Sequence, residues 1–132
     1  MKISNFRLEN QRTISFNFVI NKEYEMENEI TYNFGTEVTV GKNDEIPNKA
    51  LVTMKFEVFK KGELEQNPYY LETTIEGLFS WDEEEYDEDT LKILLNSNAP
   101  AVLLSYIRTN TALITTSAGF PPLVIPLMNF AK

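Results

Sequence analysis

The spacing of apolar residues changes once along the chain, from a period of two to spacings of three and four. Apolar and polar residues alternate in four runs, at residues 14–20, 30–34, 50–58 and 69–75. This alternation is typical of β-strands that bury one face. Turn-forming residues separate the later runs, at 41–44, 61–63 and 67–68. Four strands in succession, over about residues 2–81, predict an antiparallel meander.

Helical spacing begins after an acidic junction at residues 82–89 and covers about residues 90–118. Apolar residues recur there at intervals of three, four and seven, which indicates a helix with one apolar face. Pro100 interrupts this segment and predicts a kink. Gly119 and Pro121 end it, and residues 119–132 are expected to be an extended strip.

The predicted fold class is therefore α+β, in a single domain covering residues 1–132. It consists of a four-stranded antiparallel meander followed by one long, kinked helix on one face of the sheet. One helix covers only part of one sheet face. The third run carries large apolar residues on both faces, with Met54 and Phe56 on one and Leu51 and Phe59 on the other. This surplus of apolar surface indicates a partner, either another copy of the chain or a client.

Charge is unevenly distributed along the chain. The net charge is -8, yet the junction at 82–89 alone holds seven acidic residues. From residue 93 to residue 131, Arg108 is the only charged residue. A single charge on an apolar helix is costly unless it is paired. Arg108 is expected either to pair with a sheet carboxylate, such as Glu72 or Glu57, or to fix a contact between subunits.

The composition excludes several classes of function. The chain has no histidine and no cysteine, which rules out a disulfide framework, a Cys/His zinc site, a cysteine nucleophile and a histidine base. The acidic junction lacks the glycine and the ligand spacing of a calcium loop. An acidic chain is also a poor nucleic-acid binder. We therefore expect no enzyme activity, no cofactor, no metal site and no nucleic-acid partner.

The first residues lack the apolar core of a signal peptide, and no apolar run is long enough to span a bilayer. The sequence thus predicts a cytoplasmic protein without membrane insertion.

Eight residues in the last third of the chain stand at a distinctive spacing: Pro100, Tyr106, Arg108, Phe120, Pro121, Leu123, Asn129 and Phe130. This spacing resembles the SecB protein-export chaperone family, in which the long helix carries a similar proline and Tyr-x-Arg, followed by Phe-Pro-x-Leu and Asn-Phe. Upstream, the pattern of Glu72, Gly77 and Phe79 is similar to the Glu-x4-Gly-x-Phe that ends the family's fourth strand. The segment at 14–16 resembles its first strand.

The resemblance implies an ATP-independent holdase that assembles as a homodimer or homotetramer with the long helix at subunit contacts. Its apolar grooves would bind unfolded preproteins and pass them to the SecA motor. On this basis Tyr106 and Arg108 are assigned to the oligomer interface, and Glu72 to docking of the motor. Thr13 and Asn17 stand where the family's first strand has acids, and the sequence stops two residues after Asn-Phe, where the family has a second helix.

Two hypotheses follow. The first is a SecB-like chaperone that binds extended apolar segments of unfolded proteins. The alternative is a SecB-fold oligomeric adaptor that binds a dedicated partner without general holdase activity. The client-binding residues are expected near the end of the fourth run and in the short helical turn after the junction. They are Leu78, Phe79, Trp81, Leu91, Leu94 and Leu95.

Overall fold

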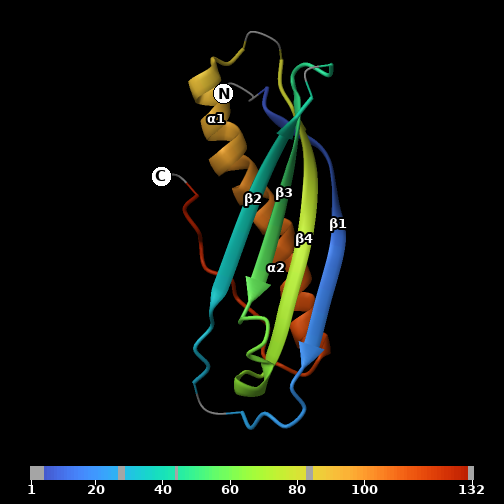
Figure 1. Cartoon of the computed structure of the whole chain (residues 1–132), viewed down its shortest axis with the longest axis vertical. Helices are drawn as coiled ribbons and strands as arrows, with labels where there is room; N and C mark the ends of the chain where they lie inside the picture. Colours follow the sequence, from blue (N-terminus) through green and yellow to red (C-terminus); the bar gives the residue numbers. More distant parts are fainter. Residues whose placement is uncertain (1–4, 27–28, 44, 83–84, 131–132) are drawn as a thin grey trace.

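The computed structural model describes residues 5–26, 29–43, 45–82 and 85–130. They form a four-stranded antiparallel sheet with one long helix against one face (Figure 1). This arrangement confirms the predicted α+β class. The strands and their connecting 3-10 turn are β1 (Arg7–Ile20), β2 (Phe34–Lys42), β3 (Lys49–Val58), η1 (Leu64–Gln66) and β4 (Tyr69–Ser80). The helical elements are α1 (Glu88–Ile93), the π-helical turn η2 (Leu94–Asn98) and α2 (Ala99–Ser117).

The order of the strands in the sheet is β1-β4-β3-β2. Only β2, β3 and β4 therefore form a meander, and β1 pairs with β4 instead of β2, as in a Greek key. Asn21, just after β1, contributes to the pairing of β1 with β4. Its backbone N–H donates to the Pro68 carbonyl at 3.0 Å, and its side-chain amide donates to carbonyls of the loop before β4, including that of Leu64 at 3.1 Å. These bonds hold the end of β1 beside the start of β4.

The first strand is longer than the alternating run at 14–20, and it is bent. Its pairing with β4 shifts register between Leu8 and Asn10 and again between Thr13 and Ser15. An extra residue in one strand of a pair increases the local twist and bends that strand. β1 consequently curves along the sheet edge (Figure 1).

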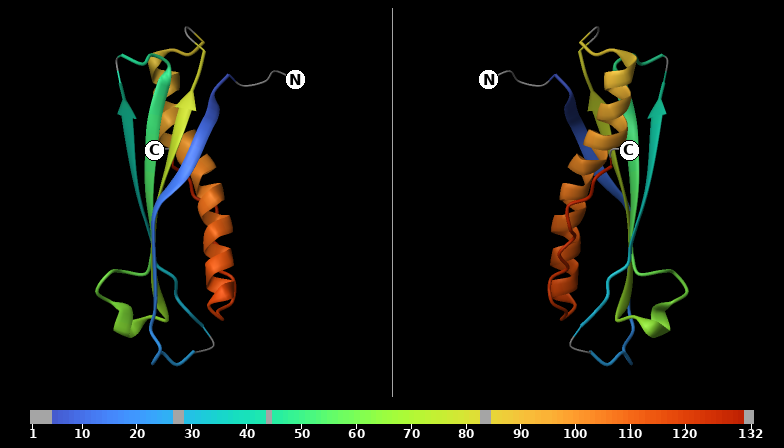
Figure 2. Two further views of the ribbon diagram at one scale, coloured as in Figure 1. Left: turned by 90° about the vertical axis from the view of Figure 1, so that its right-hand side faces the viewer. Right: turned by 90° about the vertical axis from the view of Figure 1, so that its left-hand side faces the viewer.

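The helix covers the sheet face that carries the even-numbered residues of β3. Val52, Met54 and Phe56 are fully buried, and Leu103 of α2 packs in the same core. Gly77 allows this close approach, because a Cβ atom at that position would lie 2.8 Å from Leu103 Cδ2. The opposite face carries Leu51, which is 41% exposed, and is not covered by a helix (Figure 2).

The helical segment is kinked but continuous. Asp87 caps the start of α1 by accepting a hydrogen bond from the Thr90 N–H at 2.7 Å. At the kink predicted near Pro100, the chain forms the π-helical turn η2 and enters α2 with Pro100 in its first turn. Proline has no N–H to donate, so a wider turn before it costs little. In the part of the chain that the structure describes, no helix is long and apolar enough to cross a membrane.

Phe59 departs from its predicted place on the uncovered sheet face. It follows β3 in a left-handed backbone conformation with a φ of 64°. Its N–H donates to the Asn33 carbonyl at 2.7 Å, and its ring packs against Tyr32 and Tyr69. The turn moves Phe59 into the core, where it is 3% exposed. The uncovered face is therefore less apolar than the strand pattern suggests.

The chain after α2 runs back along the helix as an extended strip, residues 119–130 (Figure 2). Leu123 and Ile125 of this strip are buried. Arg108 donates from Nε to the Ile125 carbonyl at 3.2 Å and from Nη2 to the Pro126 carbonyl at 2.8 Å. The Leu123 N–H donates to Thr115 Oγ1 at 3.0 Å. Two side chains of α2 thus fasten the strip to the helix.

Candidate functional site

The six predicted client-binding residues do not form one surface. In this conformation Phe79, Trp81, Leu91 and Leu95 belong to the core. Leu94 and Leu78 are half-buried. Leu78 lies on the uncovered sheet face, where it is paired with Leu51 of the neighbouring strand β3. A client-binding role for this group stays a prediction, and the four core residues are not accessible without opening the fold.

Glu72 lies on the uncovered face of β4, in a small network. Its Oε2 lies 2.7 Å from the Tyr70 hydroxyl, which also lies 2.5 Å from Glu57 Oε2 on β3. Lys55 Nζ lies 3.7 Å from Glu72. Burial, together with the hydrogen bonds to the two carboxylates, raises the pKa of the Tyr70 phenol far above its usual value. This network gives the face a fixed acidic spot, whose role in docking stays a prediction.

Tyr106 and Arg108 lie on the same helix but differ in their surroundings. Tyr106 is 38% exposed. It shares the outward face of α2 with Val102 and Leu113, since these positions fall within about 40° of each other around a helix of 3.6 residues per turn. Arg108 instead binds the carbonyls of Ile125 and Pro126 in the strip. Neither Glu72 nor Glu57 is its partner. Arg108 therefore donates to backbone carbonyls instead of pairing with a carboxylate. The sequence pattern did not predict these partners.

A groove lies between the edge strand β2 and the helical segment. It encloses about 590 Å³ and is lined by three segments that are far apart in the sequence. They are β2, the helical residues around the π turn, and the end of the strip; the lining residues are Thr36, Val38, Lys92, Ile93, Asn96, Ser97, Asn129 and Phe130.

Two properties of this groove matter chemically. β2 is the last strand of the sheet, so its outer edge pairs with no described strand. Its backbone N–H and C=O groups are therefore available to an added extended chain. Ile93 supplies an apolar wall and is 60% exposed. An unpaired strand edge beside apolar side chains fits an extended apolar peptide.

No group of three or more metal-ligating side chains lies close enough together to hold an ion in the described ranges. The perturbed groups have structural causes: the Thr90 backbone N–H holds the pKa of Asp87 low, and burial raises the pKa of Tyr69.

Several known proteins resemble this chain. The model of the family described as preprotein translocase subunit SecB matches residues 5–132. An uncharacterised protein of Methanocaldococcus jannaschii is 28% identical over 114 residues, covering 86% of this chain and 72% of that protein. The protein-export protein SecB of Anaplasma phagocytophilum is 41% identical over 56 residues, which is 42% of this chain and 35% of that protein.

Solved structures agree on the fold. A Mycobacterium tuberculosis SecB-like chaperone, solved with a ChAD peptide from an antitoxin, superposes with a TM-score of 0.77 at 17% identity, covering 94% of this chain and 91% of that one. A Streptococcus agalactiae protein of unknown function superposes with a TM-score of 0.52 at 14% identity, covering 96% and 100%. Because the family model spans almost all of a chain with this sheet and helix, the chain belongs to the SecB family.

Proposed function

We propose that this protein is an ATP-independent chaperone-like subunit that binds extended apolar polypeptide segments in the groove between β2, η2 and the strip. The single observation that supports this most is the unpaired edge of β2 beside Ile93 and Phe130. Main-chain hydrogen bonds to a strand edge give affinity without reading sequence, and apolar walls select for apolar side chains. Each large apolar side chain that is buried contributes about 1.5–3 kcal/mol.

The test is suppression of aggregation of a chemically unfolded model protein. Ile93→Glu places a charge on the apolar wall of the groove, and we expect it to weaken client binding by about tenfold or more. Met26→Glu is the matched control, since Met26 is 51% exposed and does not line the groove. Equal suppression by both variants, or none by the parent protein at several-fold molar excess, would exclude holdase activity in this groove.

A dedicated partner is the alternative occupant of the same groove. It is favoured by the Mycobacterium tuberculosis neighbour, whose structure contains a peptide from one antitoxin. This alternative predicts that affinity capture with the intact chain recovers a single abundant protein, while unfolded model clients are not bound. Recovery of many unrelated proteins would favour the general holdase.

We further propose that the outward face of α2 is a contact between copies of the chain. Val102, Tyr106 and Leu113 are all exposed there, and apolar patches that a single chain leaves uncovered commonly mark interfaces. In this proposal Tyr106 contacts the other copy directly. Arg108 contributes indirectly, because it holds the strip against α2. Tyr106→Glu should lower the mass measured by light scattering. An unchanged mass would remove Tyr106 from the interface.

Docking to a SecA motor through Glu72 is part of the same proposal. It predicts that Glu72→Lys weakens binding to purified SecA, while Glu63→Lys, at the N-cap of η1 in the β3–β4 connection, does not. Equal binding by the two variants would contradict it.

A further inference from the structure

The uncovered sheet face holds an apolar hollow that the proposed function does not use. It encloses about 470 Å³ at the end of the sheet where β2 turns into β3. Its lining includes Gly41, Ile46, Leu51 and Leu78. Leu51 and Leu78 are directly paired across β3 and β4. The same two leucines also line a second hollow of about 230 Å³ toward β1, so the two hollows adjoin each other.

Gly41 leaves the first hollow open. It pairs with Leu51 across β2 and β3. A Cβ atom at position 41 would meet only the Leu51 carbonyl oxygen, at 3.8 Å, which is an ordinary contact. A larger side chain therefore fits the backbone at this position but would occupy the hollow. Glycine in a strand is otherwise unfavourable.

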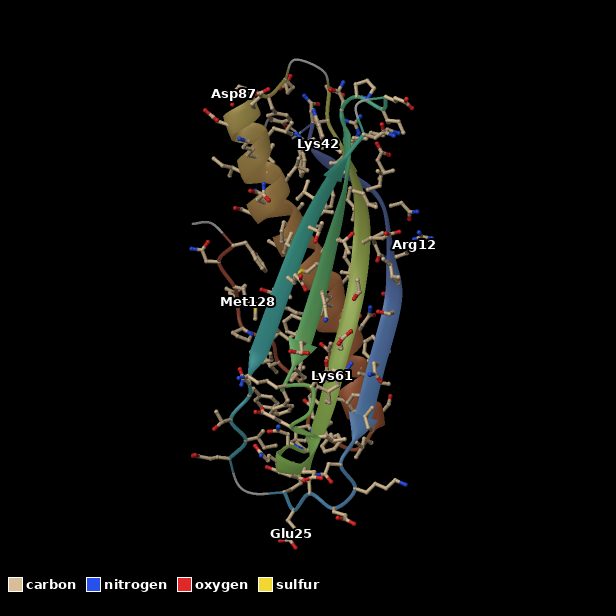
Figure 3. All side chains as sticks on the ribbon, viewed as in Figure 1. Arg12, Glu25, Lys42, Lys61, Asp87 and Met128 are labelled. Carbon is tan, nitrogen blue, oxygen red and sulfur yellow. The ribbon has the colours of Figure 1, made fainter. Side chains whose placement is uncertain are left out.

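Cations surround these leucines. Lys42 and Lys49 line the first hollow and Arg12 lines the second. Among the described residues that line the two hollows, the only acid is Glu76, which pairs with Arg12. Lys42 has no ion pair with any residue in the described part of the chain. Figure 3 shows Lys42 at the end of β2 and Arg12 on β1, which forms the other edge of the sheet.

Acidic residues stand near these lysines as well. Two of them, at positions 44 and 45, lie between Lys42 and Lys49 in the sequence. Lys49 also lies near Glu9, whose carboxylate is held by Ser80 and Arg7. Among the described residues that line the first hollow, the charged side chains are nevertheless the two lysines, Lys42 and Lys49.

We propose that this hollow is a docking site for an acidic peptide segment of another protein, one that carries a single large apolar or aromatic side chain between carboxylates. The anchor would lie on Leu51 and Leu78, and the carboxylates would face Lys42 and Lys49. Asn10 and Gln11 line the adjoining hollow, and their side-chain amides can bind the main chain of the same segment. Complementary charge would speed the encounter and fix the direction of the peptide.

A second copy of the chain is the competing occupant. Residues 23–29 hold four acidic residues around Tyr24 and Met26, so another copy carries a segment of similar chemistry. The mass of the assembly therefore belongs to the test below.

The probe is a fluorescein-labelled peptide with one tryptophan between glutamates and aspartates, followed by fluorescence polarisation against the full chain. Two matched peptides carry alanine for the tryptophan, or lysines for the acids. We expect the first peptide to bind at least about tenfold more tightly than either of the others. Increasing salt should weaken its binding, because exposed charges are screened.

Variants locate the binding. Gly41→Val fills the hollow and should abolish binding while leaving thermal stability unchanged or slightly higher. Lys42→Glu combined with Lys49→Glu should shift the preference toward the lysine peptide. Lys61→Glu, near the opposite end of the sheet (Figure 3), is the control and should bind like the parent. Ile93→Glu separates this site from the client groove and should also leave binding unchanged.

Equal binding of the acidic and lysine peptides, or full binding by Gly41→Val, would overturn the proposal. A fall in the mass of the assembly on Gly41→Val would overturn it as well, because a second copy would then be the occupant. NMR shifts of the Leu51 and Leu78 methyl groups on adding the acidic peptide would support it directly. Shifts confined to the β2 groove would contradict it.

Discussion

Removing the Arg108 side chain should release the C-terminal strip from α2. The guanidinium donates to two strip carbonyls, those of Ile125 at 3.2 Å and Pro126 at 2.8 Å. A hydrogen bond from a charged donor contributes about 1.5–3 kcal/mol when buried. Arg108 is only half-buried, so water can replace part of each bond. For Arg108→Ala we therefore expect the two bonds together to account for a loss of about 2 kcal/mol in strip docking.

The measurement is hydrogen exchange of the Leu123 amide, which donates to Thr115 Oγ1 in the docked strip. A loss of about 2 kcal/mol in local opening corresponds to exchange that is about 30-fold faster. Arg108→Lys should give an intermediate rate, because an ammonium lacks the planar fork that reaches both carbonyls. Thr109→Ala, on an exposed neighbour that bonds within the helix, should leave the rate unchanged.

The competing interpretation assigns Arg108 to a direct contact between subunits. It predicts a change in oligomer mass with unaltered exchange at Leu123. That combination would refute the role of the arginine in stabilising the strip of its own chain.

Three further predictions follow from single contacts. Gly77→Ala should lower the free energy of unfolding by about 1–3 kcal/mol through overpacking against α2, measured by urea denaturation. Thr115→Val should cost about 1–3 kcal/mol in the same assay, because the buried Leu123 N–H loses its acceptor; a neutral result would show that the strip carries little stability. For Asp87→Ala we expect a loss that depends on pH. The Thr90 N–H holds the pKa of the Asp87 carboxyl below its usual value, so the cap stabilises the fold above the unfolded-state pKa of about 3.9. The difference from the parent protein should vanish as pH falls through the lower folded-state pKa, and a difference that persists there would contradict the capping role.

Much of the fold could be predicted because its signals are local. Alternation in β3 places Val52, Met54 and Phe56 on the buried face, as observed. The apolar spacing after the acidic junction likewise predicts α2. The neighbour of β1 was not predictable in this way, because pairing between distant strands depends on tertiary contacts. In this fold β1 pairs with β4 along almost its whole length, and the bonds from Asn21 to the loop before β4 add to this pairing.

One local departure was also outside the reach of the pattern. Phe59 looks like the next residue of an alternating strand, yet a left-handed backbone turns it into the core. The kinked helix at Pro100 was predicted, but the π turn before the proline was not. In both places the backbone adjusts so that a large apolar side chain or a helix face stays buried.

The candidate groove shows a different limit. Its walls come from β2, from the end of α1 with η2, and from the end of the strip, three segments that only the folded chain brings together. Apolar identity alone could not separate Ile93, which is exposed, from Leu91 and Leu95, which are core. A usable signal was present in the helical phase, because Leu91 and Leu95 are four residues apart and share a face that Ile93 does not.

The strip links the stability of the fold to the proposed groove. Arg108 and Thr115 hold its middle against α2, and Phe130 near its end forms part of the groove wall. A client that touches Phe130 therefore binds only when the strip is docked. The apparent dissociation constant rises in inverse proportion to the docked fraction. Arg108→Ala should thus weaken client binding even though Arg108 does not line the groove. Unchanged client affinity, in a variant whose Leu123 amide exchanges faster, would show that the strip is not part of the binding site.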